Sequence, residues 1–179
     1  APLAPQDEAP RLKGDIRADV CIIGGGYCGL WTALALKARE PSLDIVIVEK
    51  NRCGDGASGR NGGFVLSWWR SIAALKNVCS TEEAFRLAAA SADCINEIAD
   101  FCRAHAIDCD FRHDGWLWAA TNQAQDGAWR SAIETLAGQQ VHPFEQWPPE
   151  KMAARTASDR HISGVFEPTA ATVQPALLA

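Results

Sequence analysis

The sequence predicts an α/β fold in which a strand, helix and second strand begin a parallel sheet, followed by part of an α+β domain with an antiparallel sheet. Residues 20–23 and 45–48 are unbroken apolar runs rich in Val and Ile, typical of parallel strands covered on both faces. A glycine-rich turn and a helical segment separate these runs. Shorter strand patterns bounded by turn residues follow after residue 107, which favours an antiparallel arrangement there.

Composition limits the class of protein. A length of 179 residues allows one domain and part of another, and 47% hydrophobic with 22% charged residues is ordinary for a globular chain. The 17 basic and 22 acidic side chains give a net charge of −5 without a long basic run, so we expect no nucleic-acid partner. The seven cysteines form no C-x-x-C pair and the four histidines have no metal-ligand spacing. We therefore expect a cytoplasmic protein without a metal site.

Two segments near the amino terminus need separate interpretation. Residues 1–17 contain Pro2, Pro5 and Pro10 and predict a flexible arm. The segment 20–36 has no charged residue, but it is shorter than the roughly 20 residues that a membrane-spanning helix needs. It also contains three consecutive glycines, which disfavour such a helix, so we expect no transmembrane span.

The first apolar run leads directly into a G-x-G-x-x-G motif formed by Gly24, Gly26 and Gly29. In such a motif the first glycine permits a tight turn, the second lets the backbone approach a pyrophosphate, and the third allows close packing of helix and strand. A helix is expected over residues 30–39, with its positive end directed at the phosphates. This arrangement predicts a Rossmann-like dinucleotide-binding unit.

The second apolar run ends in Glu49, about 20 residues beyond the last glycine of the motif. A carboxylate at this position accepts hydrogen bonds from the ribose hydroxyls of an adenosine, and its charge repels the 2′-phosphate of an NADP-type ligand. Strand, turn, helix, strand and acid in this order are more specific than the glycines alone. They predict binding of FAD or NAD, without deciding between the two.

A second glycine-rich segment follows at residues 54–63, where five of ten residues are glycine. With its ADVCIIGGGYCGL start and GASGRNGG loop, the sequence resembles the D-amino-acid-oxidase-like (DAO) family of FAD-dependent oxidoreductases. The loop 58–63 is similar to that of the γ-glutamylputrescine oxidoreductase-like members. The resemblance implies FAD as the cofactor. It also implies that Ala57 and Ser58 lie along the FAD phosphates, while Arg60, Asn61 and Gly62 run toward the isoalloxazine edge.

Some of these side chains have a second interpretation. Arg60 is either a partner of the cofactor or an ordinary surface charge. Cys28 lies near the expected amino terminus of the helix, where a thiol can be reactive, but a small packed residue beside the pyrophosphate is the simpler role. Four tryptophans could wall an amine site, although aromatic side chains more often form core. Two lie in sequence near the loop 54–63 and two near Asp114-Gly115: Trp68, Trp69, Trp116 and Trp118.

The rest of the chain predicts scaffold. Ser80 begins a capping box before a long helix over residues 84–106, and Asp114-Gly115 predicts a hairpin between strands at 109–113 and 116–120. A helix is expected at 123–136, and Pro175 suits a first helical turn. With the resemblance, this gives an FAD-binding domain at 18–106, part of a substrate-binding domain at 107–168, and a return toward the FAD domain at 169–179.

The resemblance implies that the complete protein oxidises a C–N bond of an amine or amino acid, with transfer of a hydride equivalent to the flavin and reoxidation by oxygen or another acceptor. No catalytic residue, individual substrate or oligomeric state is assigned. Members of the family are longer than this chain, so we expect a truncated form whose sheet and cofactor cleft are partly open. Two alternatives are a non-catalytic dinucleotide-binding module and an NAD-dependent dehydrogenase.

Overall fold

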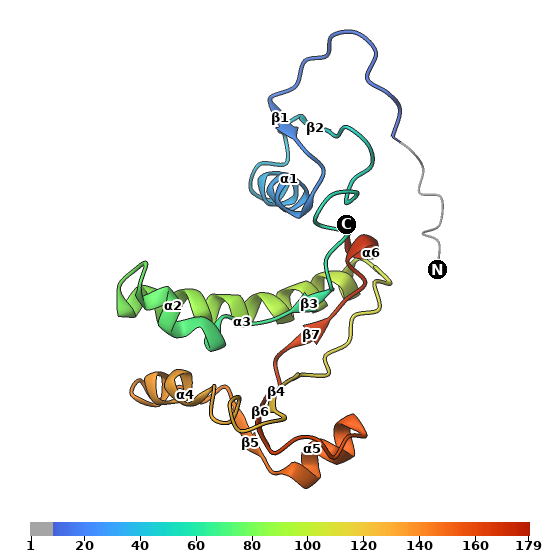
Figure 1. The fold of residues 1–179 in the computed structure, drawn as a ribbon. Coiled ribbons are helices and arrows are strands. Elements are labelled where there is room, and N and C mark those ends of the chain that lie inside the picture. Colours follow the sequence, from blue (N-terminus) through green and yellow to red (C-terminus); the bar gives the residue numbers. More distant parts are fainter. Residues whose placement is uncertain (1–8) are drawn as a thin grey trace. The chain divides into compact units, whose positions relative to one another are not determined.

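The computed structural model describes residues 9–179, which form two compact units (Figure 1). Among the described residues, unit 1 contains 9–63 together with Ala106–Asp110 and Val173–Ala179. Unit 2 contains Phe64–His105 and Phe111–Thr172. The two units group residues that pack together, whereas the expected domains group residues by the molecule they would bind, the cofactor or the substrate. The expected bounds, 18–106, 107–168 and 169–179, therefore stay a prediction.

Unit 1 contains the expected strand, helix and strand. Strand β1 (Val20–Ile23) pairs in parallel with β2 (Ile45–Val48), in a register that places Val20 opposite Ile45. Helix α1 (Tyr27–Arg39) connects them and starts at Tyr27 instead of Leu30. The earlier start arises because Gly26 already has the extended backbone of an N-cap residue, so the helix begins directly after it. The parallel βαβ unit is therefore confirmed.

Few side chains of unit 1 are buried. Helix α1 contains no buried residue, and Ile23 at the end of β1 is 88% exposed. Of the buried hydrophobic residues in the described chain, Cys109 alone belongs to unit 1. The short helix α6 (Pro175–Leu178) also lies in unit 1 and begins with Pro175 in its first turn, as the sequence predicts. The described part of the expected arm, residues 9–17, has neither helix nor strand, and residues 1–8 lie outside the described residues.

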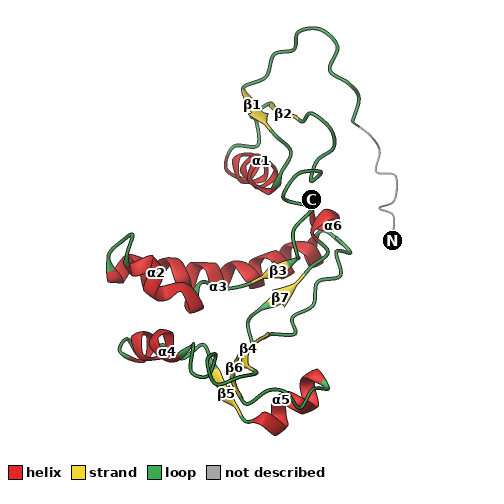
Figure 2. Cartoon of the chain, in the orientation of Figure 1, coloured by secondary structure: helices red, strands yellow, loops and turns green. Residues whose placement is uncertain are grey.

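Unit 2 has two antiparallel sheets (Figure 2). The larger has the strand order β4 (Trp116–Ala120), β6 (Ser163–Glu167) and β5 (Glu145–Trp147). The smaller pairs β3 (Phe64–Val65) with β7 (Ala171–Thr172). The antiparallel character expected after residue 107 is thus present.

The hairpin predicted at Asp114-Gly115 is wrong. Gly115 has the positive φ that the turn signal predicts, +75°, but its N–H donates to the carbonyl of Ala170 at 2.9 Å. Arg112 exchanges backbone hydrogen bonds with Thr172, and β4 pairs with β6 rather than with residues 109–113. Residues 113–115 form no turn, and pairing with the distant segment 163–172 replaces the local partner.

The helices of unit 2 pack largely on one another, and the last two of them in the chain also contact the larger sheet. In chain order they are the 3₁₀ turn η1 (Trp69–Ser71), α2 (Ile72–Lys76), α3 (Thr81–Ala104), α4 (Arg130–Ala137) and α5 (Pro149–Thr156). The predicted cap of the long helix is confirmed, because the Ser80 hydroxyl accepts a hydrogen bond from the Glu83 N–H at 3.2 Å. The helix expected at 123–136 begins only at Arg130, since the Gln125 side chain accepts from the Thr121 N–H and holds the preceding segment in turns.

Buried side chains of unit 2 form two clusters. The larger comprises Trp69, Ile72, Ala84, Ala88, Ala132 and Leu136. The smaller comprises Ala120, Trp129 and Val165.

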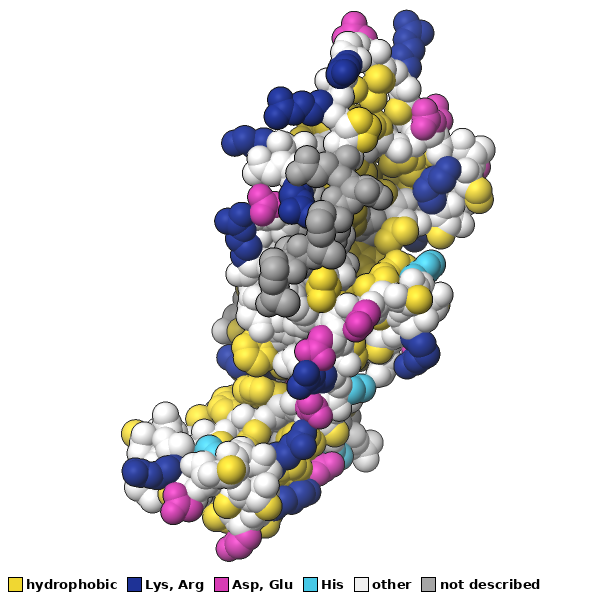
Figure 3. All heavy atoms as spheres, turned by 90° about the vertical axis from the view of Figure 1, so that its right-hand side faces the viewer, with side chains coloured by type: hydrophobic (Ala, Val, Ile, Leu, Met, Phe, Trp, Pro, Cys, Tyr) yellow, Lys and Arg dark blue, Asp and Glu magenta, His cyan; other side chains and the backbone are white. Residues whose placement is uncertain are grey.

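On the face shown in Figure 3, basic and acidic side chains are interspersed, with hydrophobic side chains visible between them. Within residues 9–179, no helix is long and apolar enough to cross a membrane.

Candidate functional site: the glycine turn and its neighbouring loop

The glycine turn after β1 is held by backbone contacts. Gly24 has φ +102°, and its N–H donates to the carbonyl of Val48 at 2.8 Å, which ties the turn to the end of β2. A Cβ at Gly29 would lie 2.1 Å from the Gly24 carbonyl oxygen and 3.2 Å from Ile22 Cγ2. The first turn of α1 therefore packs directly on the glycine turn, a contact that only glycine permits at this position.

Glu49 lies beside this turn. Its Oε2 accepts a hydrogen bond from the Gly25 N–H at 2.8 Å, and its Oε1 accepts one from the Asn51 N–H at 3.0 Å. These two bonds hold the pKa of the Glu49 carboxyl below its ordinary value, and the bond from Asn51 has the larger effect. The carboxylate is thus charged and fixed in place at the carboxyl ends of β1 and β2, where ligands of open parallel sheets bind.

The loop 54–63 contacts the start of α1 through Ser58. The Ser58 hydroxyl accepts a hydrogen bond from the Tyr27 N–H at 2.9 Å, and a Cβ at Gly26 would lie 2.9 Å from the same oxygen. Gly26 itself provides no side-chain cap for the helix. The absence of a side chain at Gly26 therefore makes room for Ser58 at the helix amino terminus.

Polar side chains within the loop bind mainly to the loop. The Asn61 amide donates to the carbonyls of Ala57, at 3.2 Å, and Ser58, at 2.8 Å, while its oxygen accepts from the Gly63 N–H at 2.8 Å. Arg60 forms an exposed ion pair with Asp55 at 2.8 Å, and this pair lowers the pKa of the Asp55 carboxyl. Gly62 is exposed.

The structure thus brings Gly24, Gly26, Gly29, Glu49 and Ser58 into one group, whereas Arg60 and Asn61 are engaged within their own loop. Sequence reasoning missed two residues that contact this group, Tyr27 and Cys53. It also missed Asp55, the partner of Arg60 within the loop. Asp55 could have been found from its charge, since it lies in the same glycine-rich loop as Arg60.

Cys53 contacts the glycine turn. A Cβ at Gly25 would lie 2.4 Å from the Cys53 sulfur, and the following Gly54 N–H donates to the Gly25 carbonyl at 2.8 Å. No sequence pattern indicates this contact, because it depends on how the loop returns to the turn. Cys28 is exposed at the start of α1, and its carbonyl accepts a hydrogen bond from the Thr32 hydroxyl at 2.6 Å.

Three tryptophans form a series of ring contacts in unit 2. The centroids of Trp116 and Trp118 are 5.6 Å apart, and those of Trp118 and Trp129 are 6.1 Å apart. The Arg70 guanidinium carbon lies 5.3 Å from the Trp116 ring centroid, within the range of a cation–π contact. Trp69 is a core residue, since only 8% of it is exposed, whereas Trp68 is 48% exposed.

Unit 2 also contains a buried carboxyl group. Glu167 is 1% exposed, and its Oε1 accepts hydrogen bonds from the hydroxyls of Ser67 and, at 2.9 Å, Thr169. Its Oε2 is buried without a hydrogen-bond partner among the described residues. Ser67 is itself 2% exposed, so the two residues form a buried polar pair.

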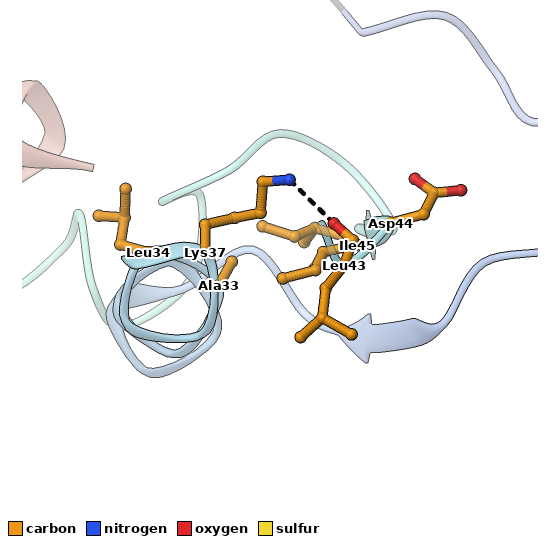
Figure 4. A pocket seen from close by; sticks show the side chains of 7 residues that line it. Ala33, Leu34, Lys37, Leu43, Asp44 and Ile45 are labelled. Carbon is orange, nitrogen blue, oxygen red and sulfur yellow. Dashed lines mark hydrogen bonds between the residues drawn. The ribbon is translucent and has the colours of Figure 1, made fainter. Parts of the chain in front are cut away.

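A small apolar pocket lies on unit 1, between α1 and β2 (Figure 4). It measures about 240 Å³ and is lined by Ala33, Leu34, Lys37, Leu43, Asp44, Ile45 and Ile47. The Lys37 ammonium donates to the carbonyl of Leu43 at 2.9 Å at its rim. These residues belong to the second half of α1 and the start of β2, so the pocket is separate from the glycine turn.

Comparison with known protein families matches almost the whole chain to one family. The sequence profile of the family described as "FAD dependent oxidoreductase" (DAO) matches residues 19–179. Gamma-glutamylputrescine oxidoreductase of Escherichia coli is 32% identical over 169 residues, which is 94% of this chain and 39% of that protein. The chain therefore spans about two fifths of the length of this relative.

Solved structures show the same fold. Glycine oxidase from Bacillus cereus matches with a TM-score of 0.66 and 22% identity, over 90% of this chain and 43% of that one. L-amino acid deaminase from Proteus myxofaciens matches with a TM-score of 0.69 and 19% identity, over 94% of this chain and 36% of that one. At these identities the likeness concerns the fold.

Proposed function

Because this chain belongs to the DAO family of FAD-dependent oxidoreductases, we propose that unit 1 binds the adenosine diphosphate half of FAD at Gly24, Gly26, Gly29 and Glu49. One observation carries this proposal. The Glu49 carboxylate is held beside the glycine turn by the Gly25 N–H at 2.8 Å, so a charged acceptor and the start of α1 lie at the same edge of the sheet. That juxtaposition suits a ribose and a pyrophosphate.

The residues of this group suit the ligand chemically. Each Glu49 oxygen accepts one backbone hydrogen bond and has a further lone pair for a ribose hydroxyl. The first turn of α1 leaves N–H groups without intrahelical acceptors, and its dipole favours a phosphate. A Cβ at Gly24 would meet nothing within 4 Å, so the turn is open on that side.

For the loop, we propose that Ala57, Ser58, Arg60, Asn61 and Gly62 continue the same site. The Ser58 hydroxyl accepts from Tyr27 and can still donate its hydrogen to a phosphate oxygen. The Arg60 side chain is 69% exposed in its pair with Asp55, and an exposed pair of this kind contributes little to stability because water screens it. A phosphate could therefore compete with Asp55 for the guanidinium. Asn61 would shape the loop rather than contact the cofactor.

For the complete protein, we propose oxidation of a C–N bond of an amine or amino acid, with oxygen or another acceptor taking the electrons afterwards. Bound FAD would supply the hydride-accepting chemistry, while the protein orients the substrate. The names of the relatives support this substrate class, since they refer to γ-glutamylputrescine, glycine and L-amino acids. Membership of an FAD-dependent family disfavours the alternative of an NAD-dependent dehydrogenase.

The proposal is tested by titrating the 179-residue chain with FAD, ADP and NAD. We expect FAD to bind more tightly than NAD, as family membership implies, and ADP to bind through the same half of the site. Glu49→Gln should weaken binding of both FAD and ADP because it removes one acceptor and the charge. Glu40→Gln is the matched control, since Glu40 is a carboxylate at the other end of α1 that accepts hydrogen bonds from Ser42. Preference for NAD, or equal effects of the two substitutions, would contradict the proposal.

The proposed reaction needs the complete protein. An FAD-loaded preparation mixed with candidate amines under anaerobic conditions should lose its flavin absorbance near 450 nm with reactive substrates, on the order of one flavin per enzyme. FAD binding without bleaching by any amine or amino acid would favour a non-catalytic dinucleotide-binding module.

A further inference from the structure

The last residues of the chain contact the glycine-rich loop of unit 1. The Val173 N–H donates to the Gly63 carbonyl at 2.8 Å, and a Cβ at Gly63 would lie 2.1 Å from the Val173 carbonyl oxygen. A Cβ at Gly59 would lie 3.2 Å from Ala176 Cβ. Two glycines of the loop therefore lie directly against the segment 173–179, which indicates that the loop and this segment pack as one piece.

Gly54 extends this contact to the start of the loop. It has φ +74°, and a Cβ there would lie 2.5 Å from Ala179 Cβ. By contrast, a Cβ at Gly56 would meet nothing within 4 Å. The glycines in the loop therefore serve different purposes: Gly54, Gly59 and Gly63 admit the chain's own segment, while Gly56 faces open space.

Tyr27 connects the same segment to the glycine turn. Its backbone N–H donates to the Ser58 hydroxyl at 2.9 Å, and its phenol donates to the Pro175 carbonyl at 2.7 Å. Tyr27 is the first residue of α1, so one residue joins the dinucleotide helix, the loop and α6. The phenol bond is between residues 148 positions apart, and it fixes α6 against the start of the helix.

The segment 173–179 is also held by a contact with Cys109 and by one within the segment itself. The Gln174 N–H donates to the carbonyl of Cys109 at 2.7 Å, and Cys109 is fully buried. The Gln174 side chain accepts from the Ala176 N–H at 2.7 Å and so caps α6. A segment held in this way can impose its shape on a loop rich in glycine, which has little conformational preference of its own.

We infer that residues 173–179 fix the conformation of the loop 54–63, and that Tyr27 is the positioning residue that joins them. The consequence for the cofactor rests on the proposed function: the loop presents Ser58 and its backbone to FAD only when the segment is in place. Residues distant in sequence from both glycine motifs would then contribute to cofactor affinity without contacting the cofactor.

Four variants of the 179-residue chain test this inference. Tyr27→Phe removes only the phenol oxygen, and Ala176→Leu enlarges the side chain that contacts Gly59. The matched controls are Thr32→Val, which removes a hydroxyl of α1 with no contact to α6, and Ala35→Leu, which enlarges an exposed alanine of the same helix. The loss of one hydrogen bond changes an equilibrium about fivefold, and overpacking of one contact changes it by about that much or more. We therefore expect amides of residues 54–63 to exchange about fivefold faster in the first pair.

Binding supplies the second measurement. FAD and ADP affinities should fall about fivefold in Tyr27→Phe and Ala176→Leu and stay within about twofold in the controls. Tyr27 is the only tyrosine in the sequence, so fluorotyrosine labelling gives a single ¹⁹F resonance that should shift in Ala176→Leu. If the unaltered chain binds neither ligand, the proposed function fails, while amide exchange still decides the inference. Unchanged exchange in both test variants would overturn it, as would faster exchange with unchanged FAD affinity.

Discussion

The glycines of unit 1 allow a prediction in which each substitution to alanine has its own physical cause. At Gly29 a Cβ would lie 2.1 Å from the Gly24 carbonyl oxygen, far inside van der Waals contact with a backbone atom that cannot rotate away. Overpacking of this kind costs about 1–3 kcal/mol, and the helix preference of alanine returns only about 1 kcal/mol. The severity of the contact places Gly29→Ala at the upper end, a net loss of about 2 kcal/mol.

Gly24 and Gly56 are the reference positions for this series of glycine-to-alanine substitutions. Gly24→Ala meets no atom within 4 Å, but its φ of +102° strains any residue with a side chain, so we expect a loss of about 1–2 kcal/mol. At Gly56 neither problem arises, because its Cβ would be free and its φ is not positive. Gly56→Ala should therefore change the free energy of unfolding by less than about 1 kcal/mol, and in the stabilising direction.

Amide hydrogen exchange of β1 and β2 is the suitable assay, because it measures opening of unit 1 separately from unit 2. A loss of about 2 kcal/mol corresponds to roughly 30-fold faster exchange of these amides in Gly29→Ala. Exchange in Gly56→Ala should be unchanged or slower. If Gly29→Ala exchanges no faster than Gly56→Ala, the close packing of α1 on the glycine turn is refuted.

Three further predictions concern single side chains. The lowered pKa of Glu49 means that ADP affinity should hold as the pH falls to 4.5, the ordinary value, and be lost only below it as the carboxylate is protonated; a loss beginning near pH 6 would show that another group is responsible. Glu167→Ala should lower the free energy of unfolding of unit 2 by about 2–4 kcal/mol in urea titrations, because it leaves a cavity and removes the acceptor of the buried Ser67 hydroxyl. Ser80→Ala should cost about 1 kcal/mol by removing the cap of α3, and an unchanged urea midpoint would mean that the bond to Glu83 contributes nothing.

Sequence reasoning predicted what local chemistry determines. Val20–Ile23 and Ile45–Val48 are strands because their residues are apolar and mostly β-branched. The glycines between them indicate that a helix follows the turn, although it begins three residues earlier than expected. The capping box at Ser80 needs only a few neighbouring residues, so it too is evident from the sequence. FAD, by contrast, was inferred from resemblance, and the family match confirms it.

Long-range pairing was not predictable in the same way. Gly115 has a positive φ, yet Asp114-Gly115 forms no turn and β4 pairs with Ser163–Glu167, because strand partners are decided by packing between distant segments. The contacts of the loop 54–63 were also not predictable from the sequence. Its glycines predict a close approach of something to the backbone, but the pattern does not distinguish a cofactor from the segment 173–179. Only the structure shows that Gly59 lies against Ala176, whereas Gly56 faces open space.

The scarcity of buried side chains in unit 1 has a thermodynamic consequence. With few buried side chains, this unit of the 179-residue chain gains little stability from hydrophobic burial, so a ligand that binds its native form adds a large share. At a free ligand concentration 100 times Kd, mass action adds about 2.7 kcal/mol to the folded state. If FAD is that ligand, saturation with FAD should slow proteolysis of unit 1 in this chain more than proteolysis of unit 2.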